Sequence, residues 1–367
     1  LEQLPAQPVS GTRAGAACPC RSPRRGSTVM QDTLTKPAGA ADAVEGEVAA
    51  ALDGASHGQA MAVAEHTLDA WRPDDSPDVL LAAFVALFNT DTRYDAATIT
   101  VPLGGADAAA VAAYAARAVR EGVIDGAQVA GDALRFTVSR ATFWQNPRPW
   151  LKSPASGGMP LRHVITNGHR HPVRPPSPAG EIYARYMPQV GMTFSLRTVD
   201  VDAHADLFSG WMNLDRVAHF WDQRGTRDEH AAYLAERLAD PHMHPMIGYF
   251  DDTPFGYFEF YWAKEDRLAP FYDAHDYDRG LHLLIGDSRF QSAGKLHAWW
   301  SGVLHYMFVD EPRTQRLVGE PRVDHVRHIA YMHRLGFYTL KEFDFPHKRA
   351  ALTVIERDTF FDTFKLP

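Results

Sequence analysis

RGLHLLIGDSRFQSAGK, residues 279–295, is the stretch from which the fold is most readily predicted. Leu281–Ile285 is a short apolar run between two glycines, which is typical of a buried strand. Polar residues follow, and from Lys295 onward apolar residues recur at helical spacing: Leu296, Trp299, Trp300, Val303, Leu304, Met307 and Phe308. This order of strand, loop and helix brings backbone N–H groups to a helix N-terminus, which favours binding of an anion.

The flanking segments extend the same alternation of strands and helices. Towards the C-terminus we expect a strand at 316–319, a helix carrying Val326, Ile329 and Ala330, and a strand pair at 339–344 and 350–356. Towards the N-terminus we expect a hairpin, 246–250 and 255–262, turning at Asp251–Pro254. Helices at 203–212 and 227–238 and a strand at 193–199 precede it. The pattern predicts an α/β (α+β) fold with a central mixed sheet.

These segments resemble the GNAT acyltransferases. Residues 289–295 are similar to the pyrophosphate loop of that family, with one glycine where two are usual, and 324–337 is similar to its closing helix before a Gly-Phe pair. The spaced motifs EFYW (259–262), DRGLH (278–282), WMN (211–213) and FW (220–221) resemble the branch that makes hydroxamates in siderophore biosynthesis. The resemblance covers about 192–361 and implies acyl transfer to an N-hydroxylated lysine, ornithine or diamine.

The resemblance also implies an acyl-CoA co-substrate, acetyl-CoA or another. The strand would splay from its neighbour and bind the pantetheine arm, and the loop would bind the pyrophosphate. The residues assigned to the cofactor are Leu283, Leu284, Ile285, Arg289, Gln291, Ser292, Ala293, Gly294 and Lys295.

His282 then lies at the splay, beside the expected position of the thioester. A neutral imidazole of ordinary pKa suits proton removal near neutrality, and a hydroxylamino nitrogen, being less basic than an amine, is already largely neutral. By resemblance, the acidic partner of His282 is Glu320, with Asp324 in reserve.

An amino-acid acceptor requires a clamp for its carboxylate and a partner for its ammonium group. We expect Arg279 to supply the first and Glu259 or Asp266 the second. Tyr261 and Trp262 are predicted to contact the substrate as well. No metal is expected, because the histidines at 163, 169, 171, 242 and 244 lack ligands at the usual spacing.

The rest of the chain sets the organisation. Of the 367 residues, we expect 1–43 to be disordered and 44–142 to form an N-terminal accessory domain that could be a degenerate GNAT copy. Residues 143–191 are expected to form a proline-rich connector without regular structure. The acyltransferase domain is expected to be 192–367. Strands at 98–101 and 133–138 and a helix at 106–121 are predicted in the accessory domain.

The composition limits which classes of partner and which cellular compartment we expect. The net charge is −8 and the basic residues are scattered, which argues against nucleic acid. No apolar run is long enough to span a membrane, and both cysteines, Cys18 and Cys20, precede the folded regions, so we expect a cytoplasmic enzyme. Met30 is the expected start of translation. A homodimer is left open, as are a siderophore synthetase and an N-hydroxylase as pathway partners.

Two alternatives stay open at this point. The first is a GNAT acetyltransferase for another amine, such as an aminoglycoside or a protein. The second is a degenerate GNAT fold that binds without catalysing.

Overall fold

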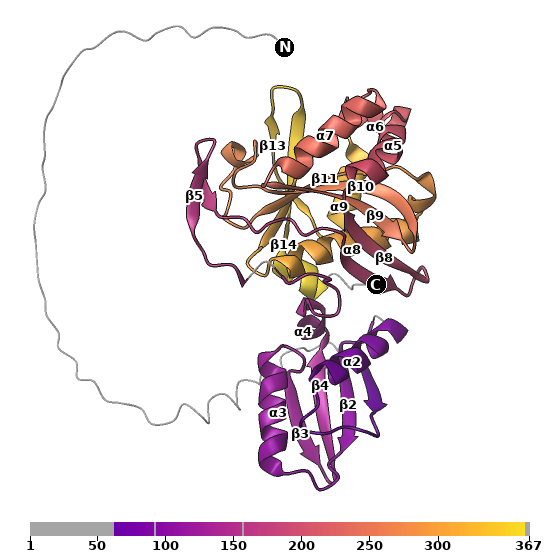
Figure 1. Cartoon of the computed structure of the whole chain (residues 1–367), viewed down its shortest axis with the longest axis vertical. Helices are drawn as coiled ribbons and strands as arrows, with labels where there is room; N and C mark the ends of the chain where they lie inside the picture. The colour runs from indigo at the N-terminus through magenta and orange to yellow at the C-terminus, as the bar shows by residue number, and fades with distance from the viewer. Residues whose placement is uncertain (1–61, 92, 156–157, 364–367) are drawn as a thin grey trace, which may run out of the picture. The chain divides into compact units, whose positions relative to one another are not determined.

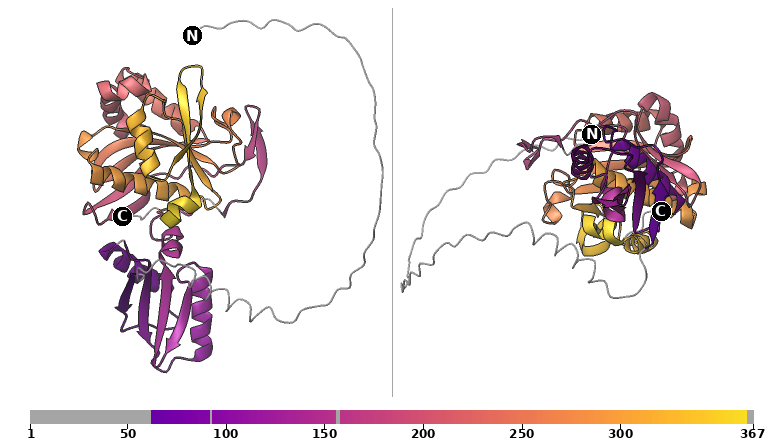
Figure 2. Two further views of the ribbon diagram at one scale, coloured as in Figure 1. Left: turned by 180° about the vertical axis from the view of Figure 1, so that it is seen from behind. Right: turned by 90° about the horizontal axis from the view of Figure 1, so that it is seen from below.

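The computed structural model describes residues 62–91, 93–155 and 158–363, and its arrangement is drawn in Figures 1 and 2. The described residues all fall within one compact unit. The expectations for 1–43, including those for Cys18, Cys20 and Met30, lie outside them. No helix among the described residues is long and apolar enough to cross a membrane.

An eight-stranded sheet forms the C-terminal part, in the order β13-β14-β12-β11-β10-β9-β8-β7. In chain order its strands are β7 (Glu181–Met187), β8 (Met192–Thr198), β9 (Met243–Phe250), β10 (Thr253–Trp262), β11 (Arg279–Ile285), β12 (Arg316–Gly319), β13 (Tyr338–Asp344) and β14 (Arg349–Glu356). All pairs are antiparallel except β11 with β12. The mixed sheet predicted from the sequence is thereby confirmed.

Helices cover both faces of this sheet (Figure 1). They are α5 (Val201–Met212), α6 (Asp215–Trp221), α7 (Arg227–Ala239), α8 (Ala293–Asp310) and α9 (Val326–Arg334). Side chains alternate along a strand, so on β9 and β10 Ile247 and Tyr257 pack under α5 to α7, whereas Phe250 and Phe258 belong to the core that contains α8. Thr226 and Glu229 form a capping box that begins α7.

The N-terminal part has its own four-stranded sheet, in the order β1-β2-β4-β3. Its elements are β1 (Val63–Thr67), α2 (Asp78–Thr90), β2 (Ala96–Pro102), α3 (Ala108–Arg120), β3 (Gly126–Ala130), β4 (Ala133–Ser139) and α4 (Arg140–Gln145). The two strands and the helix expected from the sequence are present. The boundaries proposed for the domains stay a prediction.

The connector is more regular than predicted. Within 143–191, β5 (His163–Thr166) pairs with β6 (His169–Pro172), and β7 forms the edge of the large sheet beside β8. The expectation of irregular backbone was therefore wrong for these segments. The prolines stop at Pro178, and the stretch that becomes β7 contains none before Pro188, so every residue of that strand has an N–H for the ladder.

Candidate active site

His282 lies where two neighbouring strands separate. The parallel pairing of β11 with β12 is limited to Arg279 with Leu317 and Gly280 with Val318. β12 ends at Gly319, and β11 continues to Ile285 with only β10 beside it in register. The edge of β11 that follows Gly280 is therefore open, as the resemblance to the GNAT acyltransferases implied.

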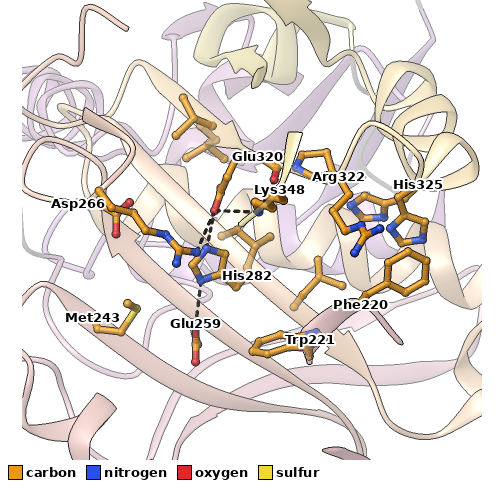
Figure 3. A pocket seen from close by; sticks show the side chains of 18 of the residues that line it. Phe220, Trp221, Met243, Glu259, Asp266, His282, Glu320, Arg322, His325 and Lys348 are labelled. Carbon is orange, nitrogen blue, oxygen red and sulfur yellow. Dashed lines mark hydrogen bonds and ion pairs between the residues drawn. The ribbon is translucent and has the colours of Figure 1, made fainter. Parts of the chain in front are cut away.

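Two carboxylates hold the His282 ring, one at each nitrogen (Figure 3). Nδ1 lies 3.0 Å from Glu259 Oε2, and Nε2 lies 2.8 Å from Glu320 Oε1. Glu259 is the direct cross-strand neighbour of His282 on β10, so their side chains share one face of the sheet. Glu320 comes directly after β12. Together the three residues form the Glu-His-Glu triad.

The triad favours a charged imidazole. Burial of His282 opposes its charge, but the attraction of Glu320 and the hydrogen bonds with both carboxylates outweigh burial and raise its pKa to about 10. Burial likewise raises the pKa of Glu259 and of Glu320, yet their contacts with His282 leave both values below the ordinary range. At neutral pH the ring is thus an imidazolium between two carboxylates. This differs from the neutral imidazole expected from the sequence, since that expectation counted one acidic partner, not two.

Tyrosines complete the hydrogen bonding of the two carboxylates, and a lysine binds the backbone of Glu320. Tyr233 and Tyr257 both donate to Glu259 Oε1, the latter at 2.8 Å. Tyr261 donates to Glu320 Oε2 at 2.7 Å, and Lys348 Nζ donates to the Glu320 carbonyl oxygen at 2.7 Å. Buried carboxylates require such partners to stay ionised.

A cavity of about 820 Å³ opens beside the triad. Its walls combine the open edge of β11, the end of β12, the residues that precede β14, and the helices α6 to α9. They include Phe220, Trp221, Tyr233, Arg237, Asp266, Arg267, Leu281, Leu283, Trp300, Leu304, Met307, Val318, Arg322, His325, His328, Met332 and Lys348.

The members of the triad differ in how far they are exposed to this cavity. The His282 side chain is 21% exposed, against 3% for Glu259 and 1% for Glu320. The ring is therefore the part of the triad that a ligand in the cavity can reach.

Two predicted site residues are engaged elsewhere. Asp324 is exposed and forms an ion pair with Arg322 at 2.6 Å, so it is not the partner of His282. Arg279 is buried and donates to Asp310 Oδ2 and to the Met307 carbonyl, each at 2.9 Å. Its charge is compensated inside the protein, which corrects the expectation that it clamps the substrate carboxylate.

The other predicted substrate contacts are mostly buried supports. Glu259 is committed to His282 and two tyrosines, and Tyr261 to Glu320. Trp262 is buried and lies under the guanidinium groups of Arg174 and Arg279. Asp266 lines the cavity, but its oxygens accept from the Leu268 N–H and from His242. The positions of Glu259, Tyr261 and Trp262 follow from the register of β10, which alternation alone does not provide.

The residues assigned to the cofactor surround the start of α8. The helix begins at Ala293, and the side chain of its N-cap residue, Ser292, makes no capping hydrogen bond. Lys295 lies over the Phe290 ring, and Arg289 pairs with Asp287. On β11, Leu283 lines the cavity, whereas the Ile285 carbonyl already accepts a hydrogen bond from Arg216.

Sequence reasoning missed several members of this site. Tyr233, Arg267 and Lys348 lie on segments with no motif, and His328 lies in the segment that resembles the closing helix but was not singled out; only the folded chain brings them to the cavity. Phe220 was part of a quoted motif, but its stacking on His325, at 3.9 Å between ring centres, was not foreseen. In the described ranges, no group of three or more His, Cys, Asp or Glu residues is arranged to hold a metal ion.

Comparison with known proteins agrees with this geometry. Residues 200–345 match the family model described as an acetyltransferase (GNAT) domain. With the sheet and the triad, this match defines the class as a GNAT acyltransferase.

Three curated relatives indicate which branch of the GNAT acyltransferases the chain is similar to. An N(6)-hydroxylysine O-acetyltransferase of Escherichia coli is 42% identical over 234 residues, which are 63% of this chain and 73% of that protein. An N(5)-hydroxyornithine:cis-anhydromevalonyl coenzyme A-N(5)-transacylase of Beauveria bassiana is 41% identical over 260 residues, 61% of this chain and 57% of that one. A hydroxyornithine transacylase of Ajellomyces capsulatus is 40% identical over 253 residues, 61% and 58% of the two chains. The chain belongs to this family of GNAT acyltransferases.

Proposed function

We propose that the protein transfers an acyl group, acetyl or a related one, from an acyl-CoA to the hydroxylamino nitrogen of N6-hydroxylysine or a hydroxylated diamine, giving a hydroxamate. The observation that carries this proposal is the Glu-His-Glu triad at the point where β11 and β12 separate, facing a cavity of about 820 Å³. The names of the relatives, which specify hydroxylysine and hydroxyornithine, support the choice of acceptor.

The reacting atom of the acceptor needs an argument of its own. The printed names differ, since one relative is an O-acetyltransferase and another an N(5)-transacylase. We favour nitrogen, because a neutral hydroxylamino nitrogen is the more nucleophilic of the two atoms at pH 7. A hydroxamate binds ferric ion strongly, whereas an O-acyl product does not, so the two outcomes are separable.

Acyl-CoA fits the residues present. The open edge of β11 after Gly280 offers backbone groups to an extended amide chain, and the uncapped first turn of α8 offers N–H groups to phosphate. The bound thioester would supply the activated acyl group. We assign the backbone of Leu283 and Leu284 to the arm and residues 291–295 to the phosphates.

Proton movement can be assigned to His282. Acylation moves one proton from the attacking nitrogen to the departing sulfur. An imidazolium can give its proton to the sulfur and regain one from the nitrogen, so His282 ends as it began. Both ring nitrogens are occupied by carboxylates, and one of these contacts has to be exchanged for substrate before transfer. Glu259 and Glu320 keep the ring charged and oriented.

The proposed acceptor and product imply neighbours in a reaction sequence. An N-hydroxylase must supply the hydroxylamine, and a synthetase that condenses hydroxamate units would consume the product.

The decisive test is thiol release by purified protein with acetyl-CoA or succinyl-CoA and, side by side, N6-hydroxylysine, N-hydroxycadaverine and lysine. We expect release that requires the hydroxyl group and a ferric-hydroxamate colour in the product. Equal release with lysine would make the enzyme a general amine acetyltransferase. Release without the colour would mean that the acyl group is transferred to oxygen. No release with any acceptor would contradict an enzymatic function.

A further inference from the structure

The cations that line the cavity differ in how far their charges are already used. Arg322 donates twice to Asp324, and Arg237 donates to Glu236. Lys348 donates to the Glu320 carbonyl oxygen. Each of these groups therefore has a protein acceptor before any ligand arrives.

Arg267 is different. In the part of the chain that the structure describes, none of its N–H groups donates a hydrogen bond to protein. Its Nη2 lies 3.8 Å from Glu320 Oε1, and its guanidinium group lies over the Phe345 ring, 5.4 Å from the ring centre. Its side chain is 53% exposed and lines the cavity. The guanidinium group is thus positioned while its donors stay available, which suits a planar, two-pronged acceptor such as a carboxylate.

The charges around the triad make such a donor necessary for one class of acceptor. With His282 protonated, the triad carries a net charge of −1, which Lys348 Nζ, 3.8 Å from Glu320 Oε1, offsets, and Asp266 lines the same cavity. A carboxylate brought into this cavity comes close to three acidic side chains and therefore requires a cation whose donors are available. An acceptor without a carboxylate has no such requirement.

The distances match the length of an amino-acid acceptor. Extended N6-hydroxylysine spans roughly 7 Å between N6 and its carboxylate carbon. His282 Nε2 and Arg267 Nη2 lie 2.8 Å and 3.8 Å from the same atom, Glu320 Oε1, so they are no farther apart than the extended acceptor is long. An acceptor with its nitrogen at His282 is therefore long enough to bring its carboxylate to Arg267.

We infer that Arg267 is the specificity-determining residue that binds the α-carboxylate of the acceptor, so that the enzyme selects a hydroxylated amino acid over a hydroxylated diamine. This inference rests on the proposed function and names the class of acceptor. It replaces Arg279, whose charge is compensated by Asp310.

The test compares two acceptors that differ only in the carboxylate, N6-hydroxylysine and N-hydroxycadaverine. Each is assayed with wild type, Arg267→Gln, Arg267→Lys and the control Arg349→Gln. Arg349 is matched in exposure, 54% against 53%, but pairs with Glu342 and Asp344 and does not line the cavity. We expect Arg267→Gln to lower kcat/KM for hydroxylysine about 10- to 100-fold, mainly through KM, and that for hydroxycadaverine by less than about threefold. Arg267→Lys should recover part of the loss, and Arg349→Gln should change neither.

Each other outcome has one meaning. An equal loss with both acceptors would overturn the role of Arg267 in acceptor choice and leave the proposed function standing, as would an unchanged kcat/KM for hydroxylysine. A raised KM for acyl-CoA with unchanged acceptor KM would move Arg267 to the cofactor. A wild-type enzyme silent with both hydroxylated acceptors would overturn the proposed function, and this inference with it.

Discussion

Glu259 and His282 face each other directly across the antiparallel pair of β10 and β11, and Glu259 Oε2 lies 3.0 Å from His282 Nδ1. The second ring nitrogen meets Glu320, which follows β12. The two carboxylates thus come from the two strands that flank β11. The ring they hold forms part of the cavity wall and carries a proton at neutral pH.

Replacing His282 tests its part in proton transfer. We expect His282→Ala and His282→Gln to lower turnover by at least about 100-fold while coenzyme A affinity stays within threefold. The alanine variant leaves two buried carboxylates without their shared cation and can lose stability for that reason alone. The glutamine variant keeps a hydrogen-bonding group, so circular dichroism and calorimetric titration of coenzyme A on that variant separate folding from chemistry. Undiminished turnover in folded His282→Gln would contradict the proposed role.

The two acidic candidates can be compared directly. Glu320→Gln removes one of the carboxylates that raise the pKa of His282, so that pKa should fall and kcat should drop about 100-fold. Asp324→Asn is the matched control, because Asp324 is exposed and paired with Arg322. It should leave kcat within about threefold. Titration of the His282 ring by NMR would measure the first effect, and a larger loss of activity in the Asp324 variant would reverse the assignment.

The stability of the protein should depend on pH through the triad. His282 has a pKa of about 10 in the fold against an ordinary value of 6.5. Its charge therefore stabilises the fold fully below about pH 6.5, and this contribution is lost as the pH rises through 10. The lowered pKa values of Glu259 and Glu320 act at the other end, where stabilisation is present above about pH 4.5 and is lost on acidification.

Urea unfolding of wild type and His282→Gln across pH 6 to 10 would measure the first of these effects. The difference in unfolding free energy between the two proteins should shrink as the pH rises. A difference that stays constant over this range would mean that folding does not raise the pKa of His282.

How far the sequence predicts this site depends on what each contact requires. Alternation and turn residues predicted β9 and β10 as a hairpin, because those signals are local. The triad depends on register, since a shift of one residue on β10 would turn Glu259 to the opposite face, and no local pattern specifies that register. The choice of Glu320 over Asp324 depends on where β12 ends relative to His282. Arg279 was assigned to the substrate because an amino-acid acceptor requires a carboxylate clamp; its actual partner, Asp310, is distant in sequence at the end of α8, so no local pattern indicates the pair.

The glycine at the start of α8 provides the last prediction. A Cβ added at Gly294 would meet nothing within 4 Å, and the same holds for Gly210 in α5. Alanine at either helical position should therefore stabilise the fold by about 0.5–1 kcal/mol. The protein itself has no steric need for glycine at 294, but a phosphate bound to the first turn would approach its backbone closely. We expect Gly294→Ala to weaken coenzyme A binding about tenfold in calorimetry and Gly210→Ala to leave it unchanged. Equal affinity of the two variants for coenzyme A would mean that the pyrophosphate does not bind at the N-terminus of α8.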